Sequence, residues 1–465
     1  MELPNASIVA PAGHGKTEMI AELVDHGNGK QLLLTHTNAG VDAITKRLKK
    51  HAVDKDKYVV STIAAFCIRW CMSYSNSAQF DKSLSPLNGR TESSKYYAQL
   101  YRGAKQIFMM VWAGKVLQAS YTGVIVDEYQ DCIQEQHEIF LEISNFLPIR
   151  VLGDPMQGIF SFAGKLVDWN NLKFQRVQVA TRPWRWASTN PALGAYLMNV
   201  RSQLLPVLDG RKCSITVDSC NGSIEIIDPQ DFDGYKKLEE FQKYSSVVYI
   251  TKWPNKQLAF CSKMPGIFQN DEKQDCDELY EYAKLFDETT GAKLLLHIID
   301  FYSICATHVS AELMSYRNRL QKGSFDFSKI TKHIDFANVI FTAKENSPCE
   351  AVCIMLQWFT KQPVFKQYRS ELASEMMRSA SLAKERNISI FEAANHIRKD
   401  NSLQRRYTQF KFLSSRTLLS KGLEFDCVII DMSDQLSAKD FYVAMTRAMR
   451  KIYILSPSAT FIFDA

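Results

Sequence analysis

The stretch that decides the fold is Ala10-Pro11-Ala12-Gly13-His14-Gly15-Lys16-Thr17, which follows the apolar run Ser7-Ile8-Val9 and precedes a segment of helical pattern. A strand that enters a glycine-rich turn and then a helix brings backbone N–H groups close to phosphate oxygens. Lys16 is placed to reach the β- and γ-phosphates, and the Thr17 hydroxyl to hold Mg²⁺. The stretch therefore predicts a nucleoside-triphosphate site. Its residues are Ala10, Gly13, Gly15, Lys16 and Thr17.

The composition is that of an ordinary globular protein. The chain has 465 residues, of which 46% are hydrophobic and 23% are charged, so we expect two to four domains. Its apolar runs are shorter than a membrane span, and Met1-Glu2-Leu3-Pro4 does not resemble a secretory signal, so we expect a cytoplasmic protein with no membrane partner. A net charge of +6 is compatible with a polyanionic partner.

Short β-branched runs alternate with helical patterns in the first third of the chain. The expected strands are 7–9, 31–35, 58–61, 123–126, 150–152 and 176–179. Strands that alternate with helices after a phosphate loop predict a parallel, doubly wound α/β sheet. The segment 73–117 departs from this rhythm and ends in an aromatic helical run, 96–117, so we interpret it as a small helical insertion.

A second set of strands is expected after a long helical interval, at 222–227, 246–251, 410–415, 427–431 and 451–455. Strands that resume after such an interval indicate an inserted domain. We therefore expect two parallel-sheet domains, each with a mostly helical insertion. The first comprises 1–72 and 118–184 with insertion 73–117, and the second comprises 185–265 and 406–465 with insertion 266–405.

Two carboxylates follow the buried-strand pattern Val124-Ile125-Val126. Asp127 is placed to hold Mg²⁺ opposite Thr17, and Glu128 to polarise a water for attack on the γ-phosphate. A solvated acidic loop is the competing interpretation, and it suits 134–138 better than a carboxylate pair at the end of an apolar strand. The pair and the phosphate loop together predict hydrolysis of a nucleoside triphosphate.

Asp127-Glu128-Tyr129-Gln130-Asp131 also resembles the DExQD signature of the UvrD/Rep-type superfamily 1 helicases. The resemblance continues in Leu34–Ala39, Ser61–Phe66 and Gly153–Phe162, which are similar to the TxTNxA, GTxHxF and GDxxQxIYxW/F segments of that family. It implies two RecA-like domains with ATP and Mg²⁺ between them, and DNA along their top. By this resemblance Gln157 senses the γ-phosphate. The residues implied to contact DNA are Thr35, Thr37, Asn38, Thr62 and Phe66.

Three further segments extend the resemblance to the second half of the chain. Arg182-Pro183-Trp184-Arg185 resembles the motif in which an arginine reaches the γ-phosphate, and Arg185 is the matching residue. Thr417–Asp426 resembles the KGLEFD motif, which implies that Glu424 approaches the ribose and Thr417 the DNA backbone. Tyr442–Ala448 resembles the YVAxTRA helix, whose arginine, Arg447, would be a second finger. A planar guanidinium suits the charge of a phosphoryl transition state.

Phe160 and Phe162 allow two interpretations. By the resemblance they offer stacking faces to bases, and stacking tolerates every sequence because each base has a π-face. The same pattern is typical of the core side of a strand.

The chain departs from the family pattern in places. A glutamine motif is absent upstream of the phosphate loop, which predicts weak selectivity for adenine. Ala163 stands where an arginine usually contacts DNA.

The sequence thus predicts an ATP-dependent single-stranded-DNA translocase or helicase that acts on single-stranded or partly duplex DNA. The resemblance implies 3′–5′ movement. The short insertions and the segments around Arg185 and Glu424 resemble the small helicase subunit of Gabija-type anti-phage systems, which implies an OLD-family nuclease partner. The alternative is a nucleotide-switched regulatory ATPase that controls a partner nuclease without processive unwinding.

Overall fold

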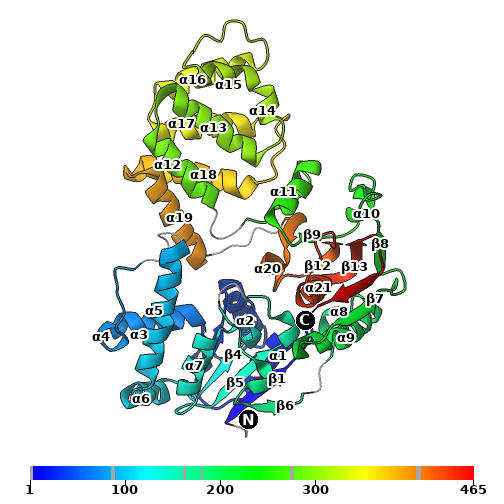
Figure 1. Ribbon diagram of the computed structural model, residues 1–465. Helices are drawn as coiled ribbons and strands as arrows, with labels where there is room; N and C mark the ends of the chain where they lie inside the picture. Colours follow the sequence, from blue (N-terminus) through cyan, green and yellow to red (C-terminus); the bar gives the residue numbers. More distant parts are fainter. Residues whose placement is uncertain are drawn as a thin grey trace. The chain divides into compact units, whose positions relative to one another are not determined.

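The computed structural model describes the chain with short gaps, over residues 4–84, 90–160, 164–179, 182–272, 277–404 and 410–464. It divides into two compact units, and Figure 1 labels their helices and many of their strands. Unit 1 comprises Met1–Asp231 and Ser420–Ala465, and unit 2 comprises Phe232–Leu419.

Unit 1 contains a parallel sheet whose strands lie in the order β3-β2-β4-β5-β1-β6. The strands are β1 (Asn5–Val9), β2 (Gln31–Thr35), β3 (Tyr58–Thr62), β4 (Gly123–Val126), β5 (Ile149–Gly153) and β6 (Gln175–Val177). Helices cover both faces. Leu33 and Ile125 share a core with α1 (Lys16–Asp25) and α2 (Asn38–Lys50). The expected parallel α/β fold is confirmed.

The opposite face of this sheet carries the other helices of the first third of the chain. Leu32, Leu34, Val124 and Val126 share one core with the apolar sides of those helices. The helices are α3 (Ile63–Ser73), α5 (Arg90–Phe108), α6 (Val111–Ser120) and α7 (Gln134–Ile143), with the short α4 (Ser75–Ala78) between α3 and α5. Alternate strand residues point to opposite faces, so Leu32 and Leu33 serve different cores.

The helical run predicted over 96–117 is two helices rather than one. The break lies at Met110, whose extended backbone (ψ 131°) precedes α6. The turn brings Gly114 against Phe146, where a Cβ on the glycine would lie 2.2 Å from Phe146 Cδ1. Helical periodicity continues through the break because both helices bury one face in the same core.

The remainder of unit 1 adds a second group of strands and helices. Parallel strands lie in the order β12-β13-β8, and β14 pairs with β7 in the antiparallel sense. The elements are α8 (Trp184–Ala187), α9 (Pro191–Leu204), β7 (Cys213–Thr216), β8 (Ile224–Ile227), β12 (Phe425–Asp431), α21 (Ala438–Met445), β13 (Ala448–Leu455) and β14 (Thr460–Phe463).

Unit 2 begins with parallel strands in the order β10-β11-β9. These elements are β9 (Val247–Thr251), β10 (Gln269–Asn270) and β11 (Phe412–Arg416), together with α10 (Leu238–Phe241), α11 (Pro254–Lys263) and α20 (Thr417–Ser420). The expected second sheet domain, 185–265 and 406–465, contributes residues to both units. The four expected domains remain a prediction.

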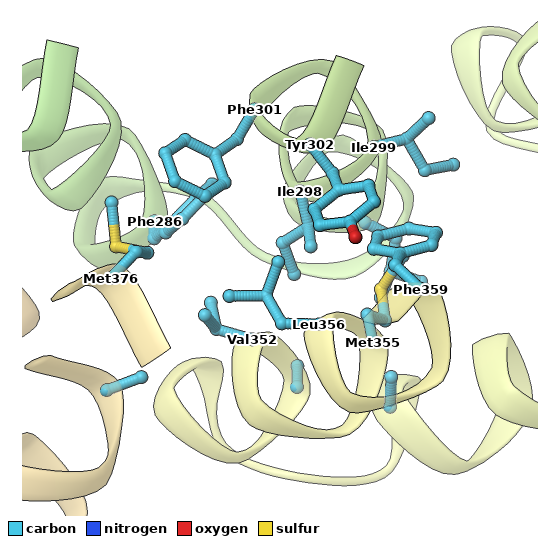
Figure 2. Close-up of a cluster of buried hydrophobic side chains, with 14 of the residues drawn as sticks. Phe286, Ile298, Ile299, Phe301, Tyr302, Val352, Met355, Leu356, Phe359 and Met376 are labelled. Atoms are coloured by element: carbon cyan, nitrogen blue, oxygen red, sulfur yellow. The ribbon is translucent and has the colours of Figure 1, made fainter. Parts of the chain in front are cut away.

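The rest of unit 2 is helical and has its own hydrophobic core. Figure 2 shows the centre of this core, where Tyr302 and Phe359 stack with their ring centroids 4.6 Å apart. The helices are α12 (Asp277–Glu288), α13 (Gly291–Cys305), α14 (Val309–Glu312), α15 (Met314–Gln321), α16 (Ile334–Lys344), α17 (Pro348–Thr360), α18 (Ser370–Arg386) and α19 (Ile390–Gln404). Across the described parts of both units, each helix is too short or too polar to span a bilayer.

The core of unit 2 predicts a large stability effect at Phe359. This side chain is fully buried, so Phe359→Ala should lower the free energy of unfolding by about 3–5 kcal/mol through lost burial and a cavity. Ile334 is 66% exposed, and Ile334→Ala should change it by less than about 0.5 kcal/mol. Urea unfolding followed by circular dichroism measures both. Equal losses in the two variants would contradict the packing described.

Candidate functional site

The phosphate loop joins the end of β1 to the start of α1. Gly13 and Gly15 have φ angles of 70° and 81°, in the left-handed region that favours glycine. Space is also restricted, since a Cβ on Gly13 would lie 2.6 Å from Trp186 and one on Gly15 would lie 2.9 Å from Trp184. The start of α1 has no side-chain cap. The loop therefore has the backbone geometry of an anion site at a helix N-terminus.

Lys16 is the buried cation of this loop. Its Nζ lies 3.2 Å from Glu128 Oε1, and the side chain is 9% exposed. Burial alone lowers the pKa of Lys16, but the negative charges of Glu128, Asp127 and Asp154 outweigh it and raise the pKa. The lysine is therefore charged and faces the carboxylates that follow β4.

Asp127 and Glu128 have different protonation behaviour although they are adjacent. Burial, followed by the charge of Glu128, raises the pKa of Asp127 to about 7. Burial also acts to raise the pKa of Glu128, but the charges of Lys16 and Lys421 overcome it and lower that pKa to about 2. Glu128 has a left-handed backbone (φ 53°) and its amide donates to Asp127 Oδ1 at 2.9 Å. The site thus pairs a permanently ionised carboxylate with one that titrates near neutrality.

The donor set of Asp127 and Thr17 suits a hard cation. A carboxylate and a hydroxyl oxygen are ligands that Mg²⁺ accepts, with phosphate oxygens and waters completing the shell. Asp127 is only 6% exposed and its pKa is raised to about 7, so a bound cation would stabilise its ionised form. The residues present therefore fit Mg²⁺.

Gln157 lies on the segment that follows β5, within a buried network. Its amide donates to the Asp154 carbonyl at 2.8 Å. The Asp154 carboxylate is fully buried and binds Arg201 of α9 through Nη2 at 2.7 Å and Nε at 3.2 Å. Tyr442 of α21 accepts from the Ala12 amide of the phosphate loop at 3.3 Å. These contacts hold the phosphate loop, the Gln157 segment and two later helices together.

Arg185 lies beside the phosphate loop at the start of α8. Its amide donates to the Gly13 carbonyl at 3.1 Å. Its guanidinium donates to Glu424 Oε1 through Nε at 2.9 Å and Nη2 at 2.8 Å, and to the Thr446 carbonyl at 2.5 Å. Glu424, which the resemblance assigns to the ribose, therefore holds Arg185 in this conformation.

Arg447 is buried two residues beyond the end of α21. Its guanidinium donates to the carbonyls of Val443 at 3.0 Å and Leu423 at 3.2 Å, and lies 3.5 Å from Gln157 Oε1. Burial, followed by the nearby charge of Arg185, lowers the pKa of Arg447 to about 9, while Glu128 and Glu424 oppose this effect. Two guanidiniums so close together favour an additional negative charge between them.

Lys421, in the second half of the sequence, contacts residues of the first half. Its Nζ donates to Asp131 Oδ1 at 2.7 Å and to the Gln157 carbonyl at 2.5 Å, and lies 5.0 Å from the ring centroid of Phe160. Lys421 and Asp131 are both largely buried. This pair was not among the residues predicted to form the site, because its members lie 290 positions apart.

The residues expected to contact DNA lie at the carboxyl edge of β2 and β3. Thr35 ends β2 and is buried. Thr37 caps α2, whose first residue is Asn38, by accepting from the Gly40 amide at 3.0 Å. Thr62 caps α3 by accepting from the Ala65 amide at 3.1 Å. Because the carboxyl ends of parallel strands share an edge, these residues and the phosphate loop lie on the same side of the sheet.

The aromatic residues expected to contact DNA are placed differently from one another. Phe66 is 2% exposed and stacks on Phe108 with centroids 5.6 Å apart, so its ring belongs to the core in this conformation. Phe160 is half-buried beside Lys421. Phe162 lies outside the described residues. Thr417 belongs to unit 2, where it begins α20.

Trp184 is a candidate that the sequence did not single out. It is 57% exposed and its Cδ1 approaches Gly15 of the phosphate loop. The Arg182 guanidinium lies 5.6 Å from its ring centroid. The available signal was an aromatic residue directly before Arg185, which the resemblance assigns to the γ-phosphate.

Comparison with known proteins agrees with this geometry. Residues 1–163 match the sequence family described as an AAA domain. The match covers the phosphate loop, Asp127 and Glu128, and Gln157. With the parallel sheets, it supports a P-loop NTPase fold. No curated protein sequence matches the chain.

Two solved structures with some likeness are viral helicases. "The structure of PRRSV helicase" has 10% sequence identity and a TM-score of 0.36, and the likeness covers 98% of this chain and 53% of that one. The arterivirus nonstructural protein 10 helicase with DNA has 10% identity and a TM-score of 0.34, with 97% and 61% covered. The chain thus spans about half to three fifths of their lengths.

The raised pKa of Asp127 predicts that Mg²⁺ binding depends on pH. A proton and Mg²⁺ compete for the same carboxylate, so the affinity for Mg²⁺ should fall about tenfold per unit below about pH 7 and level off above it. Calorimetric titration of Mg²⁺ into the protein with a non-hydrolysable ATP analogue, between about pH 6 and 8, measures this. Asp127→Asn should bind Mg²⁺ more weakly and lose the dependence. The same pH profile in both proteins would assign the titration elsewhere.

Proposed function

We propose that the chain is an ATP-dependent single-stranded-DNA translocase of the UvrD/Rep type, able to act as a DNA helicase. The observation that carries this proposal is the network of unit 1 around the phosphate loop. Lys16 contacts Glu128, Arg185 contacts Glu424, and Arg447 interacts electrostatically with Glu128, Arg185 and Glu424. A solvated charge cluster would not bury Arg447 and Asp127.

The proposed chemistry is attack of water on the γ-phosphate of ATP. Lys16 and the start of α1 bind the phosphates, and Thr17 and Asp127 would hold Mg²⁺, which would supply positive charge to the phosphate oxygens. Glu128, ionised at neutral pH, orients and polarises the attacking water. Arg185 and Arg447 then stabilise the charge that develops in the transition state, and Gln157 lies within 3.5 Å of Arg447 to report the γ-phosphate.

DNA would lie across the carboxyl edge of β2 and β3. The strand order places β4, with Asp127 and Glu128 at its end, between β2 and β5. The residues proposed to bind ATP lie on one side of this edge, and the residues proposed to contact DNA lie on the other. This arrangement would give a short route by which ATP hydrolysis is coupled to DNA binding. The 3′–5′ direction, the role in anti-phage defence and the OLD-family nuclease partner are supported by the family resemblance alone.

The adenine base would stack on Trp184. Its exposed ring lies beside Gly15 of the phosphate loop. Stacking on an indole does not distinguish purines, so we expect ATP and GTP to bind with similar affinity.

ATP hydrolysis stimulated by a single-stranded oligonucleotide tests the proposal. Lys16→Ala should abolish hydrolysis and weaken ATP binding, because the buried cation that binds the phosphates is lost. Glu128→Gln should lower turnover by about 10²–10⁴-fold and retain bound ATP. Steady-state turnover and equilibrium ATP binding separate the two effects.

A turnover that the oligonucleotide leaves unchanged would favour the regulatory ATPase instead. Hydrolysis by Glu128→Gln at the parent rate would remove Glu128 from its assigned role.

Substitution of Trp184 tests the base site. Trp184→Ala should raise the Kd of both ATP and GTP about tenfold, from the loss of about 1–1.5 kcal/mol of stacking, and Trp184→Tyr should restore most of the affinity. Tyr235 is similarly exposed, at 52%, and Tyr235→Ala serves as the matched control. Strong exclusion of GTP by the parent protein would show that another segment reads the base.

A further inference from the structure

The turn between β7 and β8 holds an asparagine in a strained stretch of backbone. Cys220, Asn221 and Gly222 are consecutive and have positive φ angles of 43°, 54° and 80°. The left-handed region suits glycine and is tolerated by asparagine, but it costs energy for a cysteine. Asn221 and Gly222 are both exposed. The turn therefore presents an Asn–Gly pair to water within a strained segment.

Asn–Gly pairs are chemically labile, because glycine has no side chain to shield its amide nitrogen, and this nitrogen can attack the asparagine side chain. The chain has a second exposed pair at Asn28–Gly29, between α1 and β2. A third pair, Asn88–Gly89, lies outside the described residues. The bonds that react are identical in the two described pairs, so the fold is what makes their reactivity differ.

The peptide group that joins Asn28 to Gly29 is fixed by its neighbours. The Asn28 carbonyl accepts from the Thr122 hydroxyl at 2.6 Å and from Gln31 Nε2 at 3.3 Å. Thr122 also packs on the glycine, since a Cβ on Gly29 would lie 2.4 Å from Thr122 Cγ2. Attack by the Gly29 nitrogen requires this peptide group to rotate, and the rotation would break both hydrogen bonds.

The peptide group that joins Asn221 to Gly222 has different surroundings. The hydrogen bonds of the turn lie on either side of it. The Ser223 amide donates to the Cys220 carbonyl at 3.0 Å, and Lys451 Nζ donates to the Gly222 carbonyl at 2.9 Å. Within the described ranges, the Asn221 carbonyl has no hydrogen-bond partner, and a Cβ on Gly222 would meet no other atom within 4 Å. This peptide group can therefore rotate while the flanking contacts remain.

We propose that Asn221 is a site of spontaneous deamidation. The Gly222 nitrogen bonds to Asn221 Cγ and gives up its proton to the side-chain amide nitrogen, which leaves as ammonia, so that a cyclic imide forms. Water then adds to either imide carbonyl and opens the ring, giving aspartate or isoaspartate. The net change is the uptake of water and the release of ammonia. This modification is independent of the proposed function.

Deamidation would change the turn in its charge and in its backbone. The new carboxylate adds a negative charge near Lys451, whose Nζ contacts the neighbouring Gly222 carbonyl. Isoaspartate also lengthens the backbone just before β8. That strand pairs with β13, which begins directly after Arg447.

Peptide mass spectrometry of the full-length protein, incubated in heavy-oxygen water at mildly alkaline pH, tests the proposal. Ring opening by this water marks each deamidated residue with a heavy oxygen atom. Asn221 should convert at least about tenfold faster than Asn28, because the two hydrogen bonds on the Asn28 carbonyl must break before attack. In concentrated urea, where both peptides are unfolded, the two rates should become similar.

Two variants serve as controls. Thr122→Val removes the hydroxyl that donates to Asn28, so deamidation of Asn28 in the folded protein should become several-fold faster. An unchanged rate at Asn221 in the same sample shows that this variant remains folded. Asn221→Gln lengthens the side chain and disfavours ring closure, so the label at this position should disappear while Asn28 keeps its rate.

Equal rates at Asn221 and Asn28 in the folded protein, or a faster rate at Asn28, would overturn the proposal. A ratio that stays the same in urea would assign the difference to the adjacent residues instead of the fold, and would also overturn it. The same holds if Asn221 remains unmodified in the folded protein over a period in which the unfolded chain is converted.

Discussion

The ion pair between Lys16 and Glu128 is the interaction on which the site of unit 1 depends. Lys16 is only 9% exposed, so its charge would be costly alone, and the 3.2 Å contact with the half-buried Glu128 compensates it. A triphosphate bound at the phosphate loop would compete for the same ammonium group. Nucleotide binding would then release Glu128 toward water at the moment when the γ-phosphate arrives. In the proposed function, this one ion pair would link ATP binding to catalysis without a further conformational change.

Long-range contacts extend this link to the rest of unit 1. Lys421 binds Asp131, Arg185 binds Glu424, and Tyr442 accepts from Ala12 of the phosphate loop. Each contact joins the first 185 residues of the sequence to its last fifty residues. In the proposed function, a change in charge at the phosphate loop would act directly on the segments that carry the later motifs.

Local patterns made much of this predictable from the sequence. The phosphate loop, the strand before Asp127 and the parallel sheet all follow from residues adjacent in the chain. Arg201 and Lys421 were missed because their partners, Asp154 and Asp131, lie 47 and 290 positions away. The break at Met110 was missed because periodicity does not report where a helix turns. Burial of Phe66 depends on Phe108, which a motif match does not include.

The most direct test of the account is the movement of the protein along single-stranded DNA. Stopped-flow fluorescence with thymidine oligonucleotides of increasing length, labelled at one end, measures the time needed to reach that end after ATP is added. If hydrolysis drives stepping, this time should increase linearly with oligonucleotide length, and Glu128→Gln should show no such phase. A time independent of length, in a protein that hydrolyses ATP and binds the oligonucleotides, would contradict translocation and favour a nucleotide-controlled switch.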